Sequence, residues 1–154
     1  MHKYKLTIEY DGKDFKGWQR QDNGISIQSS IEKAVKKFSN EDVTLFGAGR
    51  TDSGVHAKGQ VAHFELVNNF SVENIRDGIN QYLRPLPIAI LGAECVDNNF
   101  HARFSAKHRI YKYIIFNRVS VPSIYKNRGW HIRKKLDLKL MKKGTQKLLG
   151  TNDY

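Results

Sequence analysis

The order of apolar periodicities along the chain constrains its fold more than any other feature. Alternating apolar and polar side chains are typical of strands, and apolar side chains three or four residues apart are typical of helices. The expected strands are residues 5–10, 43–46, 60–66 and 88–93, and the expected helices follow the N-capping hydroxyls of Ser26 and Ser71. This β-α-β-β-α-β order is the split βαβ unit, so the sequence predicts an α+β protein with a ferredoxin-like half.

The last third of the chain repeats only the start of this pattern. Residues 109–116 predict a further strand and residues 136–149 a further helix, separated by an exposed loop over residues 119–133. The apolar residues expected to point inward from this helix are Leu138, Met141 and Leu148. We therefore expect two domains: a ferredoxin-like half at residues 1–104, and an incomplete, strongly basic start of a second, similar half at residues 105–154.

The net charge of +11 is concentrated in that last third. Residues 1–104 carry 13 Lys and Arg and 13 Asp and Glu, whereas residues 105–154 carry 13 Lys and Arg and only two Asp. A local surplus of this size indicates a polyanion partner, most commonly nucleic acid. A solvated basic helix is the alternative. The interleaved aromatic side chains favour RNA, because unstacked bases bind aromatic faces; they are Tyr111, Tyr113, Tyr125 and Trp130.

Composition excludes several classes of protein. No apolar run approaches the roughly 20 residues of a membrane span, and the N-terminus lacks the apolar stretch of a signal peptide, so we expect a cytoplasmic protein without membrane contact. Cys95 is the only cysteine, which excludes an intrachain disulfide and a thiolate metal cluster. We expect no metal site, because the spacing of the histidines fits no tight ligand set; these are His56, His63, His101 and His108.

A glycine-rich connection, LFGAGRTDSGVHAKGQVAHF at residues 45–64, joins two of the expected strands. Its glycines indicate a sharp turn or a close approach of backbone to another group. Asp52 follows Arg50 by two residues, so a fixed turn could pair them and keep the carboxylate ionised, as a nucleophile or base requires. The alternative is an ion pair that only braces the turn, and composition alone favours that alternative.

The motif RTDSGVH at residues 50–56 resembles the active-site signature of the bacterial-type tRNA pseudouridine synthase A family. Three other blocks resemble further family segments, in the family's order along nearly the whole chain. They are IEYDG and FKGWQRQ at residues 8–21, FHARFSA and RIYKY at residues 100–113, and LLGTNDY at residues 148–154.

This resemblance implies an enzyme that isomerises uridine to pseudouridine in the anticodon arm of tRNA, at positions 38–40. The reaction implies no cofactor, which agrees with the lack of a dinucleotide fingerprint, a Walker loop or a zinc pattern. Family members are longer homodimers with two ferredoxin-like halves around a cleft. We therefore expect this chain to be truncated at its C-terminus.

The resemblance also implies roles for three residues. Asp52 would be the catalytic aspartate, acting either as the nucleophile at C1′ or as the base that removes a ribose proton. Arg50 would pair with Asp52 and fill the gap left by an extruded uridine. Tyr111 would stack on the target base and could accept the proton lost from C5. On periodicity alone, however, Tyr111 is a core aromatic side chain, because it shares a strand face with Tyr113 and Ile115.

Five further residues are candidates for substrate binding. Trp18, Gln19 and Arg20 lie in the first loop, which approaches RNA in the family, although Trp18 could equally be a buried anchor that closes this loop. His56 ends the RTDSGVH motif, and Arg103 is a candidate phosphate contact.

Two other functions fit parts of the pattern. RNA-recognition domains share the β-α-β-β-α-β order, but KGQVAHF at residues 58–64 lacks the aromatics at the third and fifth positions of their central strand motif. A non-catalytic RNA-binding fragment is the stronger form of this alternative, because half of a cleft can bind RNA without catalysis. A polynucleotide hydrolase would need metal-binding carboxylates or a histidine pair, and Asp52 has no second carboxylate within its motif.

Overall fold

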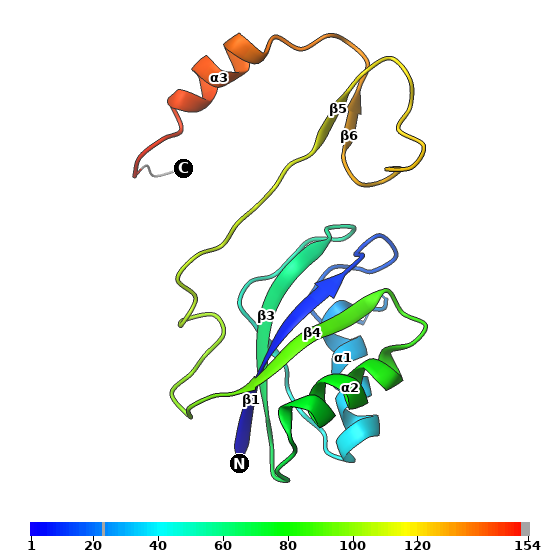
Figure 1. Ribbon diagram of the computed structural model, residues 1–154, viewed down its shortest axis with the longest axis vertical. Coiled ribbons are helices and arrows are strands. Elements are labelled where there is room, and N and C mark those ends of the chain that lie inside the picture. Colours follow the sequence, from blue (N-terminus) through cyan, green and yellow to red (C-terminus); the bar gives the residue numbers. More distant parts are fainter. Residues whose placement is uncertain (23, 152–154) are drawn as a thin grey trace. The chain divides into compact units, whose positions relative to one another are not determined.

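The computed structural model describes residues 1–22 and 24–151. The chain forms two compact units, Met1–Arg109 and Ile110–Tyr154 (Figure 1). Each unit is described by itself below.

The first unit contains an antiparallel sheet in the order β2-β3-β1-β4. Its elements are β1 (His2–Tyr10), α1 (Ile27–Ser39), β2 (Phe46–Gly47), β3 (Ala57–Leu66), α2 (Val72–Leu83) and β4 (Ile88–Cys95). Each helix joins two strands that have another strand between them, which is the split βαβ topology. The predicted α+β, ferredoxin-like fold is confirmed.

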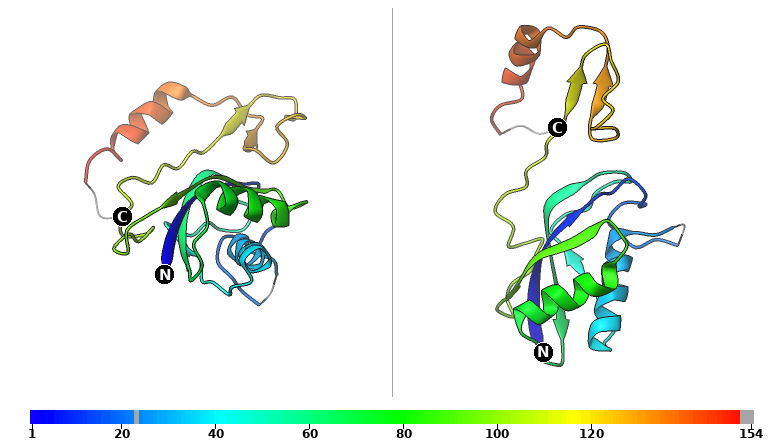
Figure 2. Two further views of the ribbon diagram at one scale, coloured as in Figure 1. Left: turned by 60° about the horizontal axis from the view of Figure 1, so that its bottom comes forward. Right: turned by 45° about the vertical axis from the view of Figure 1, so that its right-hand side comes forward.

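One face of this sheet forms the hydrophobic core with α1 and α2 (Figure 2). Side chains of a strand alternate between faces, and the even-numbered residues of β1 from Tyr4 to Tyr10 all point into the core. Fully buried isoleucines of both helices, among them Ile31 and Ile79, pack against them. Burying each such side chain contributes about 1.5–3 kcal/mol relative to its exposure.

The predicted helix starts are confirmed. The Ser26 hydroxyl accepts the backbone N–H of Ser29 in a capping box, and the Ser71 hydroxyl accepts that of Asn74. The second helix ends at Leu83, two residues before Pro85, as its sequence predicts.

The second predicted strand is wrong in extent, because β2 comprises only Phe46–Gly47. Leu45 is buried, but its backbone bonds to α1 and not to a strand: its N–H donates to the Glu32 carboxylate at 3.0 Å, and its carbonyl accepts from the Gln28 amide at 3.1 Å. Side chains of α1 therefore replace a strand partner at this point.

The second unit contains the parallel strands β5 (Ile115–Asn117) and β6 (Trp130–Ile132), and α3 (Leu138–Gln146). Three predictions for this unit are wrong in extent or content. The strand predicted over residues 109–116 is only β5, and the helix predicted over residues 136–149 is only α3. The loop predicted over residues 119–133 contains β6. No residue of α3 is buried, and Leu138, Met141 and Leu148 are exposed. An amphipathic pattern predicts a helix, but burial also requires a second layer to pack against.

The segment after β4 folds back onto the sheet face opposite the helices. One contact there is His63 of β3, which is only 3 % exposed and whose Nδ1 accepts the Ala102 N–H at 3.2 Å; another is Lys3 of β1, which donates to the Phe100 carbonyl at 3.2 Å. The ring of His63 stacks on Phe46 and contacts His101 edge-on. This contact fixes the segment that carries Arg103.

No helix in the described part of the chain is long and apolar enough to cross a membrane.

The contact of His63 with Ala102 predicts a pH-dependent stability. Burial, and then the positive charges of His101 and Lys3, lower the pKa of His63 below its ordinary value of 6.5. Because the unfolded chain binds this proton more readily than the folded one, the contribution of His63 is complete above about pH 6.5 and declines as the pH falls toward the lowered pKa.

The measurement is the free energy of unfolding in urea at about pH 7.5 and pH 5, for the wild type and for His63→Gln. The glutamine oxygen can still accept the Ala102 N–H but does not titrate. We expect the advantage of the wild type to shrink at the lower pH; an advantage of equal size at both would contradict this role.

Candidate active site

The loop at residues 48–56 joins β2 to β3, and its first residues are fixed to β3. The Ala48 N–H donates to the Val61 carbonyl at 2.8 Å, and the Gln60 amide donates to the Gly49 carbonyl at 2.7 Å. The loop therefore begins from a defined position on the sheet.

The centre of this loop is fixed from two directions. The Thr51 hydroxyl bonds to the Tyr10 hydroxyl at 2.8 Å, and the Thr51 carbonyl accepts the Trp18 N–H at 2.9 Å. The Asp52 carbonyl then accepts the Val55 N–H at 3.2 Å, which closes a turn. The backbone on both sides of Asp52 is thus held in place.

The first loop, residues 11–25, packs directly against this loop, backbone to backbone. A Cβ at Gly17 would lie 2.5 Å from the Thr51 carbonyl oxygen, and one at Gly12 would overlap the Val55 carbonyl oxygen. Gly17 also has φ +86°, a left-handed conformation that favours glycine. The Ser53 hydroxyl adds a bond to the Phe15 carbonyl at 3.0 Å. The two glycines therefore permit a contact that no other residue type fits.

The side chain of Asp52 is exposed, in an open depression of about 340 Å³. The other residues that line it are Lys16, Gln19, Gln21, Arg50, Thr51 and Ser53. The depression offers one carboxylate, two cations and several amide and hydroxyl groups. Such a site can bind a polar, anionic ligand and present a carboxylate to it.

The expected ion pair between Arg50 and Asp52 is wrong for this structure. Both side chains line the depression, but among the described residues no ion pair or hydrogen bond joins them. Both are exposed, and an ion pair between exposed side chains gains little over separate solvation. The structure therefore brings the two residues to one site without pairing them.

Trp18 is the buried anchor that the sequence left as one of two alternatives. Its side chain is 3 % exposed, its ring lies 6.1 Å from that of Tyr10, and a Cβ at Gly47 would overlap the indole. The buried indole closes the first loop from inside.

Its neighbours Gln19 and Arg20 are exposed. Gln19 lines the depression, whereas Arg20 is held against α1: its N–H donates to the Gln28 side chain at 3.0 Å, and its guanidinium pairs with the largely buried Glu32 carboxylate at 3.4 Å.

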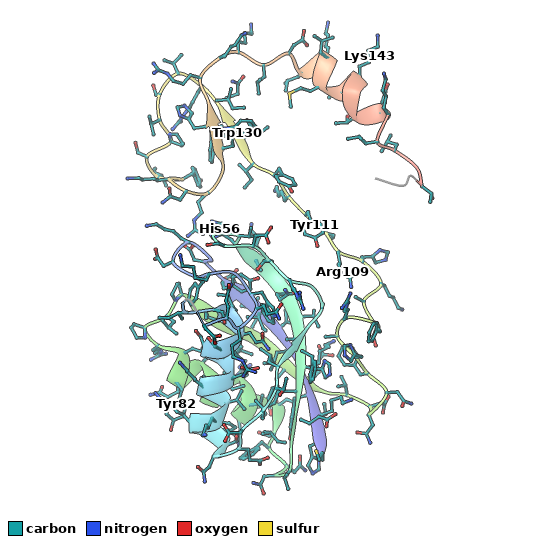
Figure 3. All side chains as sticks on the ribbon, turned by 180° about the vertical axis from the view of Figure 1, so that it is seen from behind. His56, Tyr82, Arg109, Tyr111, Trp130 and Lys143 are labelled. Atoms are coloured by element: carbon teal, nitrogen blue, oxygen red, sulfur yellow. The ribbon has the colours of Figure 1, made fainter. Side chains whose placement is uncertain are left out.

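His56 and Arg103 also belong to the first unit. The His56 ring nitrogen Nδ1 is 2.8 Å from the Asp11 carboxylate (Figure 3). Arg103 is exposed, and its guanidinium lies over the ring of Phe104. Tyr111 belongs to the second unit, in extended chain before β5, and is 68 % exposed, so it is not a core residue. Its role at the site remains a prediction.

Sequence reasoning missed several residues around the loop. Lys16 and Gln21 line the depression, and both lie in FKGWQRQ, which was the available signal. Arg109 donates from its guanidinium to the Ala48 and Arg103 carbonyls, each at 3.0 Å from Nη2 (Figure 3). Nothing in the local sequence pattern distinguishes an arginine that makes these bonds from one that is exposed and solvated.

In the part of the chain that the structure describes, no group of three or more His, Cys, Asp or Glu side chains is arranged to hold a metal ion.

The close packing of the two loops makes Gly17 sensitive to substitution. In Gly17→Ala we expect the new Cβ to displace residues 51–53 and to strain the backbone, with a loss of about 1–3 kcal/mol in the free energy of unfolding. Gly59→Ala is the matched control, because a Cβ at that exposed position of β3 meets nothing within 4 Å. Urea unfolding checks both variants; equal losses would show that the packing is not restrictive.

The sequence is similar to those of known proteins. A sequence model described as tRNA pseudouridine synthase matches residues 6–105. Proteins named tRNA pseudouridine synthase A are similar over the whole chain, at 47% identity in Paramagnetospirillum magneticum and 51% in Pelagibacter ubique. The chain covers 60% and 63% of these two relatives, so it spans about three fifths of their length. The matched region contains both loops, the second half of β1 and the whole of β2, β3 and β4, and the chain belongs to the tRNA pseudouridine synthase family.

Proposed function

We propose that this protein isomerises uridine to pseudouridine in tRNA, with Asp52 as the catalytic carboxylate. The observation that carries the proposal is the exposed Asp52 side chain, which lies in an open depression on a loop whose backbone is fixed on both sides. A fixed, accessible carboxylate can reach the sugar of a nucleotide, and its fixed backbone reduces the cost of orienting it. Family membership supplies the reaction class.

The reaction breaks the N1–C1′ bond of uridine and forms a bond from C5 to C1′. The C5 proton is lost and N1 gains a proton, so atoms and electrons balance without a redox step and without a cofactor. Asp52 either attacks C1′ or removes a ribose proton, and both routes need the carboxylate on the sugar side of the base.

We further propose roles for Arg50 and Tyr111. Because the Arg50 guanidinium is exposed and makes no bond to Asp52, it is available to occupy the gap that the extruded uridine leaves in the RNA stack. Tyr111 would stack on the extruded base and take the C5 proton. Its exposed ring supports this role more than a core role.

The RNA would be bound by both units. In the first unit, Lys16, Gln19 and Arg20 lie at or next to the depression, and His56 and Arg103 are further candidates. In the second unit, basic side chains accompany exposed aromatic rings, with Tyr113 92 % exposed and Trp130 69 % exposed. Phosphate-binding cations and stacking rings together suit single-stranded or looped RNA.

Three further proposals concern the substrate, the oligomeric state and the location, and they follow from the resemblance to the family. They are an anticodon-arm substrate with its target at positions 38–40, a homodimeric active form and a cytoplasmic location. We also propose that residues 105–154 form the start of a second ferredoxin-like half.

A non-catalytic RNA-binding role is the second candidate. The observation that favours it is the concentration of positive charge and exposed aromatic rings in the second unit, away from Asp52 in the sequence. It predicts tRNA binding that Asp52 does not influence and no isomerisation.

The test of catalysis is tritium release from tRNA labelled at uridine C5, because each turnover must shed that label. We expect Asp52→Asn to lower the release rate by at least about 10²-fold, the typical contribution of a positioned acid, base or nucleophile. Asp14→Asn, an exposed carboxylate of the first loop, is the control and should retain the wild-type rate. Binding without release in the wild type would favour the non-catalytic role, and full activity of Asp52→Asn would exclude Asp52 as the catalytic group.

The proposed RNA contact of the second unit predicts a change in salt dependence. Neutralising Arg133 and Lys134 to Gln should weaken tRNA binding and reduce the slope of log K against log salt concentration by about 0.7–0.9 for each lost phosphate contact. The control neutralises Lys33 and Lys37, two exposed lysines of α1. Filter binding at several salt concentrations measures the slope; equal effects of the two pairs would indicate only nonspecific attraction.

A further inference from the structure

The loop at residues 48–56, which carries Asp52 and is called the catalytic loop below, bonds to two polar side chains of the sheet, Tyr10 and Gln60. The Tyr10 hydroxyl bonds to the Thr51 hydroxyl at 2.8 Å. The Gln60 amide in turn donates to the Gly49 carbonyl at 2.7 Å. Two side chains of the sheet therefore hold this loop, Gln60 at Gly49 and Tyr10 at Thr51.

These two bonds hold Gly49 and Thr51, the residues on either side of Arg50, and Thr51 directly precedes Asp52. The Asp52 carboxylate itself has no hydrogen bond or ion pair within the described residues. Its position therefore depends on the backbone that carries it, and Thr51 is where that backbone meets the sheet.

The sheet is irregular at Tyr10, the residue that bonds to Thr51. In the pairing of β1 with β3, Ile8 lies opposite Gln60. Regular antiparallel pairing would then place Tyr10 opposite Lys58, but Tyr10 pairs with Ala57, one residue closer to the start of β3. Such bulges redirect side chains and occur frequently next to active sites. Tyr10 is 3 % exposed, and its ring lies 6.1 Å from that of Trp18.

We propose that Tyr10 is a positioning residue for Asp52, acting through Thr51. The inference rests on the proposed function, but it concerns a side chain that does not touch the substrate. Burial raises the pKa of Tyr10 above its ordinary value, although its bond with Thr51 lowers it, so the hydroxyl stays neutral across the physiological range. Removing it would leave the buried side of Thr51 without its partner and would loosen the loop.

Tyr4 provides a matched control on the same strand. It lies on the same face of β1, is fully buried, and its hydroxyl bonds to the Phe70 N–H at 2.8 Å and to the Phe70 carbonyl at 2.9 Å. It therefore loses comparable hydrogen bonds when changed to Phe, but those bonds hold the chain before α2 and not the catalytic loop.

The experiment compares Tyr10→Phe, Thr51→Val, the double variant and Tyr4→Phe in the 154-residue chain. Single-turnover tritium release at saturating tRNA measures the chemical step, tRNA titration measures binding, and amide hydrogen exchange of residues 49–55 measures the order of the loop. We expect Tyr10→Phe and Thr51→Val each to lower the rate about three- to tenfold with unchanged affinity. The double variant should lose no more than either single variant, because both remove the same bond.

Amide exchange across residues 49–55 should accelerate in Tyr10→Phe and remain at the wild-type level in Tyr4→Phe. Equal rates and equal loop exchange in Tyr10→Phe and Tyr4→Phe would overturn the proposal, as would additive losses in the double variant. If the wild-type chain releases no tritium, the proposed function fails for this chain, and the exchange comparison alone then decides whether Tyr10 orders the loop.

Discussion

The structure depends on the direct backbone contact between its two glycine-containing loops. The bond from the Trp18 N–H to the Thr51 carbonyl is possible only because Gly17 lacks a Cβ. This contact joins the loop after β1 to the loop between β2 and β3, two segments that are more than 30 residues apart in sequence. It converts an exposed connection of small and polar residues into a fixed support for Asp52.

The parts of the fold that local chemistry dictates could be predicted from the sequence. The hydroxyls of Ser26 and Ser71 precede amphipathic stretches and begin α1 and α2, and alternation along β1 identified its buried face. The glycines of residues 45–64 indicated a sharp turn or a close approach, and the structure shows one of each: Gly54 has φ +80°, and a Cβ at Gly47 would overlap the Trp18 indole. These features depend on a few neighbouring residues, so a single sequence contains them.

Features that depend on distant partners could not be predicted. Residues 43–45 have strand composition, yet Leu45 bonds to Glu32 and Gln28 of α1, which no local pattern records. The proximity of Arg50 and Asp52 in sequence suggested an ion pair, but sequence spacing does not fix the direction of two exposed side chains. Likewise, the apolar stripe of α3 predicted the helix correctly and its burial wrongly.

Among the described residues no ion pair joins Arg50 to Asp52, and this bears on the roles that we propose for them. If Arg50 held Asp52, a single side-chain bond would orient the carboxylate, and Arg50 could not leave it to enter the RNA stack without releasing Asp52. In the structure the backbone around Asp52 is held instead by Tyr10, Gln60 and Trp18, all from outside the loop. The position of Asp52 therefore does not depend on Arg50, which agrees with the separate roles that we propose for the two residues.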